Sequence, residues 1–328
     1  MVRLAFLGDL MLGRNLNYAA MENGPAYPWG NTLPVLKSAD LRLANLECVI
    51  SDKGVPWAPG EKAFHFRAEP LAIPVLKAAE IGFVSLANNH SLDFSKDALF
   101  DMLSRLDEAG IRHAGAGADF SEAAAPAILE AGSLKVGVIS ATDNTPEWEA
   151  KPGSPGVFFL PTLPRPEVLE KIGKSARLAR EKGAETIVFS DHWGPNMRQR
   201  PGPLHESFAS SVLDIGIDIF HGHSAHIFQG VGMHGGKPVL FDTGDFVDDY
   251  AVDPHLRNDW SFIFLLDLGA KTGRLQKVTL VPAHISGCQA NLAPEPLAGI
   301  ICQKMESLCL EMGTEARKEG RNLVIEPA

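Results

Sequence analysis

Three histidines lie within six residues at the end of an apolar segment, at His221, His223 and His226. Neutral imidazole is the commonest protein ligand for zinc, manganese and iron-type cations. If the apolar segment is a strand, His221 and His223 point the same way. Gly222 then allows a bend, after which a turn can return His226 to them. The spacing therefore predicts a metal site; the alternative is that one or two of these histidines are ordinary core or surface residues.

Other polar side chains that could join this site follow other apolar segments. They stand at or just after the predicted strand ends, at Asp9, Glu47, Asn89 and His192. Carboxylate and amide oxygens combined with imidazole suit manganese, iron, zinc or magnesium rather than a thiolate-bound metal. One carboxylate can bridge two ions, and two cations about 4 Å apart can activate a water as hydroxide. We therefore expect one or two divalent cations.

The segments that position these residues alternate between strands and helices. Strands are predicted over 2–7, 41–46, 64–66, 82–86, 111–114, 186–190, 215–220 and 323–325, with hairpins at 127–141 and 229–241 and an antiparallel pair at 261–268 and 275–283. Helices are predicted over 32–37, 70–80, 95–109, 167–182, 204–213 and 296–312. Ser95 is expected to cap its helix and Gly110 to end it, while Arg14 is expected in a loop. The pattern predicts an α/β fold of two mixed sheets packed face to face with helices outside, and ligands bind at the strand ends of such sheets.

Length and charge limit the class of protein. The 328 residues are interpreted as one domain, with cleft loops over 143–166 and 246–258; a plain surface connection is the alternative for the first. We expect the acidic residues from Asp245 to Asp253 to lie in a solvated loop. The net charge of −10 argues against nucleic acid and anionic membranes as partners. We find no run long enough for membrane insertion, and we expect a cytoplasmic protein with four free cysteines.

Six short motifs follow one another along the chain. They are Gly8-Asp9-Leu10-Met11-Leu12-Gly13-Arg14, Asn45-Leu46-Glu47, Ala87-Asn88-Asn89-His90-Ser91-Leu92-Asp93, His192-Trp193-Gly194, Gly222-His223-Ser224-Ala225-His226 and Thr243-Gly244-Asp245-Phe246. In this order they resemble the motifs of the bacterial capsule-synthesis (CapA-type, poly-γ-glutamate) proteins. That family belongs to the calcineurin-like metallophosphoesterase superfamily. The resemblance implies a four-layer α/β/β/α sandwich with a dinuclear-type metal site.

The resemblance also assigns roles to individual residues. Asp9 and His226 would bind the first metal, Glu47 would bridge, and Asn89, His192 and His223 would bind the second. His90 would act as an acid near the leaving group; the alternative is that it only orients the metal ligands. Asn89 could instead be a turn residue. We expect Asp93 to orient His90 or a nearby backbone group, and Arg14 either to hold a substrate carboxylate or phosphate or to pair with an acid.

Three departures from the superfamily pattern leave the reaction open. Met11 stands where phosphoesterases usually have a histidine, the bridging acid is Glu47 instead of Asp, and the last histidine pair is spaced GHxxH instead of GHxH. The capsule family shares these changes, which leave the first metal short of a ligand. In addition, Asp245 replaces an Asn that is common in the family. The leading hypothesis is a soluble metal-dependent hydrolase in which a metal-bound hydroxide attacks a phosphoester or a γ-glutamyl-type amide. The alternatives are a metal-dependent epimerase acting on a peptide or amino-acid derivative and a non-catalytic component of polyglutamate synthesis. In the enzyme hypotheses, the partner is a small-molecule or peptide-like substrate.

Overall fold

The computed structural model describes residues 1–58 and 62–327, and this part of the chain forms two large β-sheets. The main path of the larger, ten-stranded sheet is β19-β20-β17-β16-β1-β2-β5-β6, with β15 paired to β1 and β18 to β17. Its strands are β1 (Val2–Leu10), β2 (Leu41–Leu46), β5 (Phe83–Ser85), β6 (Arg112–Ala114), β15 (Asp245–Val247), β16 (Trp260–Leu268), β17 (Leu275–Ser286), β18 (Gln289–Leu292), β19 (Arg317–Glu319) and β20 (Asn322–Ile325).

The smaller sheet has six strands in the order β13-β14-β12-β11-β9-β8. They are β8 (Ala127–Ala131), β9 (Leu134–Thr142), β11 (Thr186–His192), β12 (Ile219–His223), β13 (Val231–His234) and β14 (Lys237–Leu240). Two short pairs lie outside the large sheets: β3 (Val49–Ile50) with β4 (Arg67–Ala68), and β7 (Ala116–Gly117) with β10 (Gly156–Val157).

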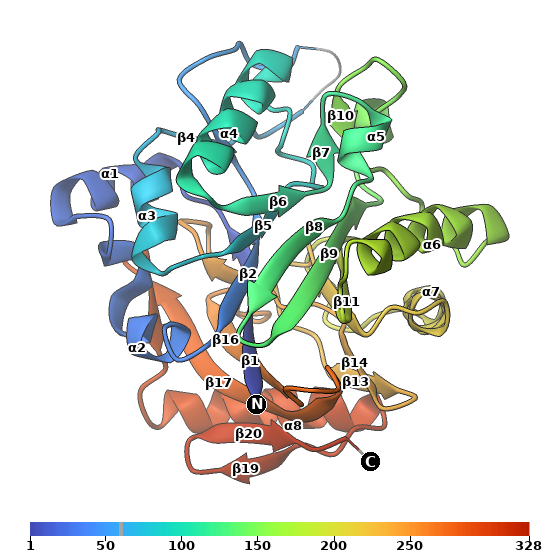
Figure 1. Ribbon diagram of the computed structural model, residues 1–328. Helices are drawn as coiled ribbons and strands as arrows, with labels where there is room; N and C mark the ends of the chain where they lie inside the picture. Colours follow the sequence, from blue (N-terminus) through green and yellow to red (C-terminus); the bar gives the residue numbers. More distant parts are fainter. Residues whose placement is uncertain (59–61, 328) are drawn as a thin grey trace.

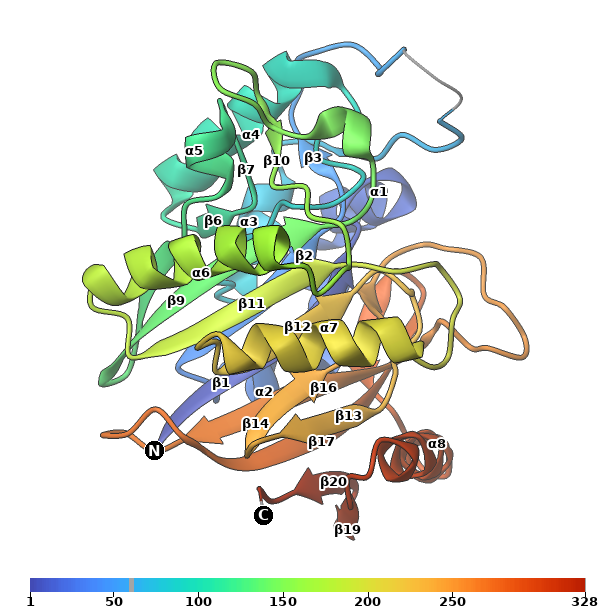
Figure 2. The ribbon, with the colours of Figure 1, turned by 90° about the vertical axis from the view of Figure 1, so that its right-hand side faces the viewer.

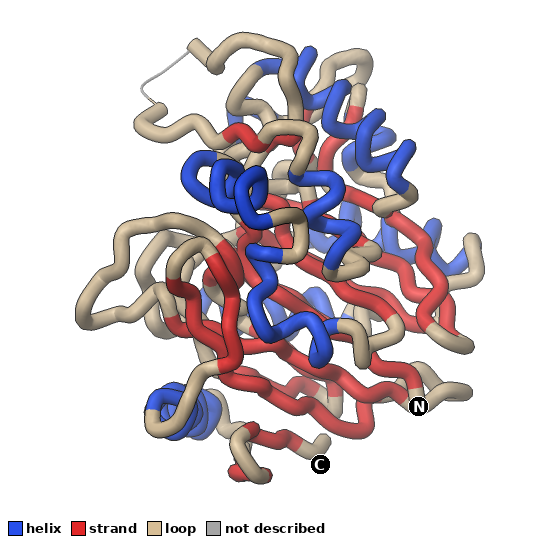
Figure 3. The backbone as a smooth tube through the Cα atoms, turned by 90° about the vertical axis from the view of Figure 1, so that its left-hand side faces the viewer, coloured by secondary structure: helices blue, strands red, loops and turns tan. Residues whose placement is uncertain are grey.

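Helices cover the outer faces of both sheets (Figure 1). The larger sheet carries α1 (Arg14–Asn23), α2 (Leu33–Leu36), α3 (Ala72–Ala78) and α4 (Ser95–Ala109). In Figure 2, α6 (Pro166–Glu181) and α7 (Pro203–Asp214) lie in front of the smaller sheet, and Figure 3 shows the helices on the opposite side. The remaining helices are η1 (Tyr27–Thr32), α5 (Phe120–Ala123), η2 (Pro146–Trp148) and α8 (Leu297–Glu311). None of the described helices is long and apolar enough to span a membrane.

Three separate apolar cores lie between the layers and explain the strand sequences. On β1, Leu4 and Phe6 face the smaller sheet, whereas Ala5 and Leu7 face the helices. Strands buried on both faces read as nearly continuous apolar runs, as β1 does. Ile301 and Met305 of α8 complete the core between the sheets. The predicted four-layer α/β/β/α arrangement is confirmed.

The parallel strands bring the polar motifs to neighbouring strand ends. In the larger sheet, Asp9 of β1 is paired with Asn45 of β2 on one side and with Asp245 of β15 on the other. In the smaller sheet, the last residues of β11 and β12, His192 and His223, are paired with each other. The positions of Asp9, Asp245, His192 and His223 are therefore fixed by sheet register.

Local differences from the sequence prediction have simple causes. Ser95 is not a cap: it is the first residue of α4, with φ +70°, and its hydroxyl donates to the carbonyl of Val55. Gly110 ends this helix in the left-handed conformation, as predicted. Arg14 begins helix α1 instead of lying in a loop, and the strand predicted at 64–66 forms directly after that segment, as β4.

Candidate metal centre

Two groups of possible metal ligands share the carboxylate of Asp9. The ligand atoms within each group lie within 4.8 Å of one another, and all but His226 are buried residues. The first group is Asp9, His192 and His223; the second is Asp9, Glu47, His226 and Asp245. Five of the six ligand residues predicted from the sequence therefore come together, and Asp245 joins them.

An asparagine pair that the sequence analysis did not assign supports Asp9. The side-chain amide of Asn45 donates to Asp9 Oδ1 at 2.8 Å and lies 3.3 Å from Nδ1 of His192. Asn88 in turn donates to Asn45 Oδ1 at 3.0 Å. A signal for Asn45 was present, because residues two apart on a strand face the same side, and Asn45 stands two residues before Glu47.

His192 and His223 present nitrogen atoms to each other across neighbouring strands. Their Nδ1 atoms are 3.0 Å apart, and Nδ1 of His223 is 3.8 Å from Asp9 Oδ1. Burial lowers the pKa of both rings well below its ordinary value, and the neighbouring histidines add a smaller effect in the same direction. Neutral rings have the lone pair that a cation needs.

His226 and Asp245 form the other side of the centre. A turn in which Ser224 and His226 both have positive φ returns His226 toward the strand ends, as predicted. Its Nδ1 lies 2.9 Å from Asp245 Oδ1, 3.6 Å from Asp9 Oδ2 and 3.9 Å from Glu47 Oε2. Burial alone would lower the pKa of His226, but these three carboxylates outweigh burial and raise it well above its ordinary value.

The expectation that Asp245 lies in a solvated loop is wrong. Asp245 is fully buried in β15, and Asp248 is 5% exposed. The parallel pairing of β15 with β1 aligns Asp245 with Asp9, which a sequence pattern could not reveal because the strands are over 200 residues apart. Burial raises the pKa of Asp245 to about 6, an effect that the nearby His226 opposes.

The residues present fit a divalent cation. Asp9 Oδ2 and Asp245 Oδ2 are buried oxygens without a hydrogen-bond partner among the described residues, and so is Asn89 Oδ1. Burial and the neighbouring Glu47 raise the pKa of Asp9 well above its ordinary value. For Asp9 and Glu47 both to be ionised, a positive charge must therefore lie near them. Carboxylate oxygens together with neutral imidazoles are ligands for manganese, iron, zinc and magnesium.

His90 lies beside the two ligand groups and is held in place by Asp93. Its Nδ1 is 2.6 Å from Asp93 Oδ2, and its Nε2 is 3.9 Å from Glu47 Oε1. Asp93 also pairs with Lys62 at 2.8 Å, a contact that no sequence motif indicated. The amide nitrogen of Asn89 is 3.3 Å from His90 Nε2, so Asn89 lies next to His90. Asp93 therefore orients His90, and the Nε2 atom of His90 faces the ligand groups.

An aromatic wall connects Arg14 with this centre. The ring of Phe66 stacks on His90 with 4.1 Å between centroids, and the hydroxyl of Tyr250 donates to Glu47 Oε2 at 2.8 Å. The Arg14 guanidinium lies 5.7 Å and 6.0 Å from the centroids of these two aromatic rings, and its Nε is 3.2 Å from Asp249. The Arg14 side chain is 43% exposed, so it lies at the surface end of this wall.

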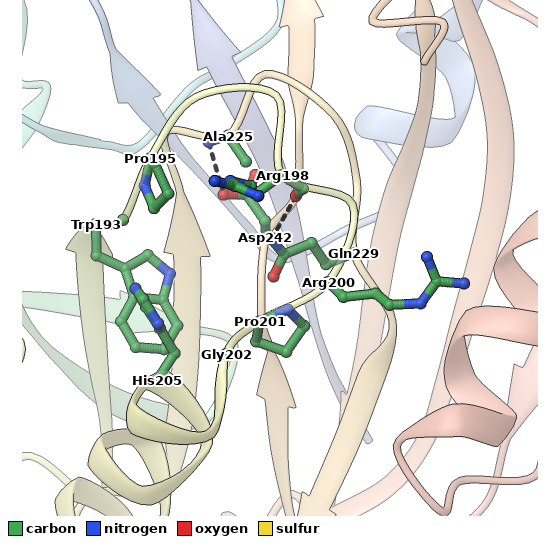
Figure 4. Close-up of a pocket in the computed structure, with 11 residues that line it drawn as sticks. Trp193, Pro195, Arg198, Arg200, Pro201, Gly202, His205, Ala225, Gln229 and Asp242 are labelled. Carbon is green, nitrogen blue, oxygen red and sulfur yellow. Dashed lines mark hydrogen bonds between the residues drawn. The ribbon is translucent and has the colours of Figure 1, made fainter. Parts of the chain in front are cut away.

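A separate cavity of about 260 Å³ lies beside the loop that follows β11. Figure 4 shows the residues that line it. Trp193 and Ala225, which are direct neighbours of ligand residues in the sequence, line it, but none of the six ligand residues does. Trp193 packs on Phe208 and Phe220 in the core beneath α7. None of its lining residues belongs to either ligand group, so this cavity is distinct from the candidate metal centre.

The fold is that of metallophosphoesterase-like phosphatases. A solved structure of a novel phosphatase from Mycoplasma pneumoniae superposes with a TM-score of 0.52 at 13% identity, over 86% of this chain and 92% of that one. At this identity, the similarity concerns the fold alone.

Within this fold class, the chain belongs to the bacterial capsule synthesis protein PGA_cap family, which it matches over residues 3–250. It is 33% identical over 270 residues to the "Probable polyglutamine synthesis accessory protein" of Mycobacterium tuberculosis, covering 79% of this chain and 70% of the relative. It is 26% identical over 289 residues to the "Capsule biosynthesis protein CapA" of Bacillus anthracis, covering 84% of this chain and 69% of the relative. The family resemblance drawn from the motifs is confirmed.

Proposed function

We propose that this protein is a divalent-metal-dependent hydrolase that cleaves a phosphoester or a γ-glutamyl-type amide. The observation that supports this most directly is the sharing of Asp9 by two ligand groups, with Nε2 of His90 directed at the same place. A divalent cation at such a centre supplies Lewis acidity, which polarises the substrate and lowers the pKa of water.

Met11 stands where a histidine ligand is expected, and this was the argument for an epimerase instead of a hydrolase. Met11 is fully buried in the core beneath the helices. Asp245, however, contributes a carboxylate to the second ligand group, which then contains four residues. The missing ligand was the reason for considering an epimerase, and Asp245 removes that reason.

Proton transfer is the part of the reaction that we assign to His90. Asp93 accepts from Nδ1 of the ring, and Lys62 and the backbone amide of Phe66 hold Asp93 in place. The only ring nitrogen left to exchange a proton with a reacting group is therefore Nε2. General acid–base catalysis of this kind typically contributes about 10²–10⁴-fold to the rate.

Arg14 is the candidate for binding the substrate's negative charge. Its guanidinium is held above Phe66 and Tyr250, and both of these rings contact residues of the centre. A guanidinium recognises carboxylate and phosphate by paired hydrogen bonds. The names of the relatives, which refer to polyglutamine and capsule synthesis, favour the amide over the phosphoester.

The test is a hydrolysis screen of phosphoesters and γ-glutamyl peptides with chelated protein and with protein supplied with manganese, zinc or magnesium. We expect turnover only with metal, and we expect its loss in His192→Ala and Asn89→Ala. His234→Ala is the matched control, because His234 lies near the surface, paired with Asp214, and should keep full activity. Undiminished turnover in the first two variants, or turnover that survives chelation, would reject the proposal.

A second candidate function is a non-catalytic accessory role in polymer synthesis, favoured by the name of the M. tuberculosis relative, an accessory protein. In that case, His192→Ala would weaken metal binding and the assembly of a synthesis complex, with no hydrolysis of any substrate to lose. Co-purification with the polymer-synthesis machinery, measured for the wild type and for His192→Ala, separates the two functions.

A further inference from the structure

His221 is a buried histidine that belongs to neither ligand group. It is 1% exposed and stands two residues before His223 on β12. Its ring lies between two hydrogen-bonding partners, the carbonyl of Leu7 on one side and the hydroxyl of Ser190 on the other. Ser190 also contacts His223, so a continuous chain of polar atoms leads from Leu7 to a candidate metal ligand.

The carbonyl of Leu7 determines which groups donate and which accept in this series of hydrogen bonds, because a carbonyl can only accept. His221 Nε2 lies 3.1 Å from the oxygen of Leu7 and must donate to it. The same nitrogen is 3.2 Å from the hydroxyl of Thr243, whose proton is directed to the carbonyl of Gly222. The His221 ring is buried and pairs with no carboxylate among the described residues, so it is neutral and has its one proton on Nε2. Nδ1 of His221 therefore accepts.

The hydroxyl of Ser190 connects His221 to His223. Its hydroxyl lies 3.3 Å from His221 Nδ1 and 2.9 Å from His223 Nε2. A hydroxyl has a single proton, so when it donates to His221 it must accept from His223. If Ser190 instead donated to His223, its oxygen would face the bare Nδ1 of His221, and that buried nitrogen would have no proton to accept.

We propose that His221 and Ser190 are positioning residues that fix the tautomer of His223, with the proton on Nε2 and the lone pair of Nδ1 directed at the cation. This inference rests on the proposed metal centre. Nδ1 is the atom that lies 3.8 Å from Asp9 Oδ1 and 3.0 Å from Nδ1 of His192. Partners that fix the ring orientation of a metal-binding histidine are typically worth about 10–100-fold in metal affinity.

The first part of the test needs no metal. Long-range ¹H–¹⁵N correlation spectra of the metal-free, histidine-labelled protein distinguish a protonated Nε2 from a protonated Nδ1. We expect both His221 and His223 to be protonated on Nε2 at neutral pH. In Ser190→Ala, the tautomer of His223 should become mixed, whereas Ser190→Thr, which keeps the hydroxyl, should restore it.

Ser140→Ala is a closely matched control. Ser140 is paired with Ser190 on the neighbouring strand β9, is equally buried, and its hydroxyl has no partner among the described residues. Metal affinity measured by calorimetry with manganese should fall about tenfold or more in Ser190→Ala and His221→Gln and stay unchanged in Ser140→Ala.

Two results would overturn the inference. One is a wild-type His223 protonated on Nδ1; the other is a Ser190→Ala protein that keeps both the tautomer and the metal affinity. If the wild-type protein binds no metal at all, the proposed function fails, but the spectra of the metal-free protein still decide whether the chain of hydrogen bonds fixes the tautomer.

Discussion

Asn45 donates its side-chain amide to Oδ1 of Asp9, which leaves Oδ2 of the same carboxylate without a hydrogen-bond partner among the described residues. The neutral amide cannot balance the charge of a buried carboxylate that has Glu47 beside it. Asn45 thus holds Asp9 in position, while Oδ2 faces His226 at 3.6 Å without a hydrogen bond, which is the arrangement expected of a metal ligand.

Asp9→Asn should separate metal binding from folding. Removing the buried charge should leave the metal-free protein at least as stable as the wild type, because burial disfavours the ionised carboxylate. The wild type should gain about 2.7 kcal/mol when free manganese is 100 times the Kd, and the variant should lose this gain. Denaturant unfolding with and without manganese measures both effects. Asp214→Asn, at the surface, should behave as the wild type.

Tyr250→Phe should weaken metal binding without disturbing the aromatic wall. The substitution removes the hydroxyl that donates to Glu47 Oε2 and keeps the ring beside Phe66. Loss of such a supporting hydrogen bond is expected to lower metal affinity about 10-fold and the stability of the metal-free protein by about 1 kcal/mol. Tyr18→Phe, on an exposed residue, is the control. Equal affinity in the two variants would mean that the Tyr250 hydroxyl does not hold Glu47.

Arg14→Gln should raise KM for a negatively charged substrate about tenfold and change kcat less. An interaction that binds the ground state and the transition state equally affects KM alone. Arg14→Lys should recover only part of the loss, because an ammonium group does not form the paired hydrogen bonds of a guanidinium. Steady-state kinetics on a charged substrate and on its neutral analogue measure the effect. A similar KM increase for both substrates would contradict the assignment.

Gly8→Ala should prevent the correct placement of Asp9. A Cβ at Gly8 would lie 1.7 Å from the carbonyl oxygen of Gly244, whose position is fixed by a hydrogen bond from the backbone amide of Asp9. We expect a stability loss of about 3 kcal/mol or an unfolded protein. In contrast, Gly173→Ala in helix α6 meets only a flexible arginine side chain and should stabilise the protein by about 0.5–1 kcal/mol. Urea unfolding of both variants tests the opposite signs.

Asp101→Asn should remove a stability contribution that depends on pH. Burial opposes ionisation, but hydrogen bonds from Lys53, Arg105 and Ser51 lower the pKa of Asp101 to about 2. The folded-state pKa lies below the unfolded value of about 3.9, so the ionised carboxylate stabilises the fold above about pH 4 and ceases to do so as the pH falls to 2. The variant should be about 1–2 kcal/mol less stable at pH 7, and this difference should shrink toward pH 2. A difference that is constant with pH would contradict this.

Strand ends were the part of the site that the sequence could predict. Asp9, Glu47, His192 and His223 each follow an apolar run, and parallel strands bring such ends together at one edge of a sheet. This prediction needs only local sequence patterns, because the pairing of the parallel strands brings their ends together.

Residues that reach the site from loops could not be predicted in this way. Tyr250 meets Glu47 from 203 positions away, and Lys62 meets Asp93 with no motif around it. The alignment of Asp245 with Asp9 depends on a three-residue strand. Ser95 failed as a cap because its hydroxyl instead bonds to Val55, a tertiary contact that overrides the local preference.

The donor atoms of the centre belong to two different sheets. Asp9 and Asp245 lie on the larger sheet, and His192 and His223 on the smaller one. The spacing between the sheets is set by apolar side chains such as Phe6, Val138 and Val188, which fill the core between them. The ionic radius that fits between carboxylates and imidazoles is therefore determined by the volume of this core. The preference for one metal over another can thus change through a methyl group that touches no ligand.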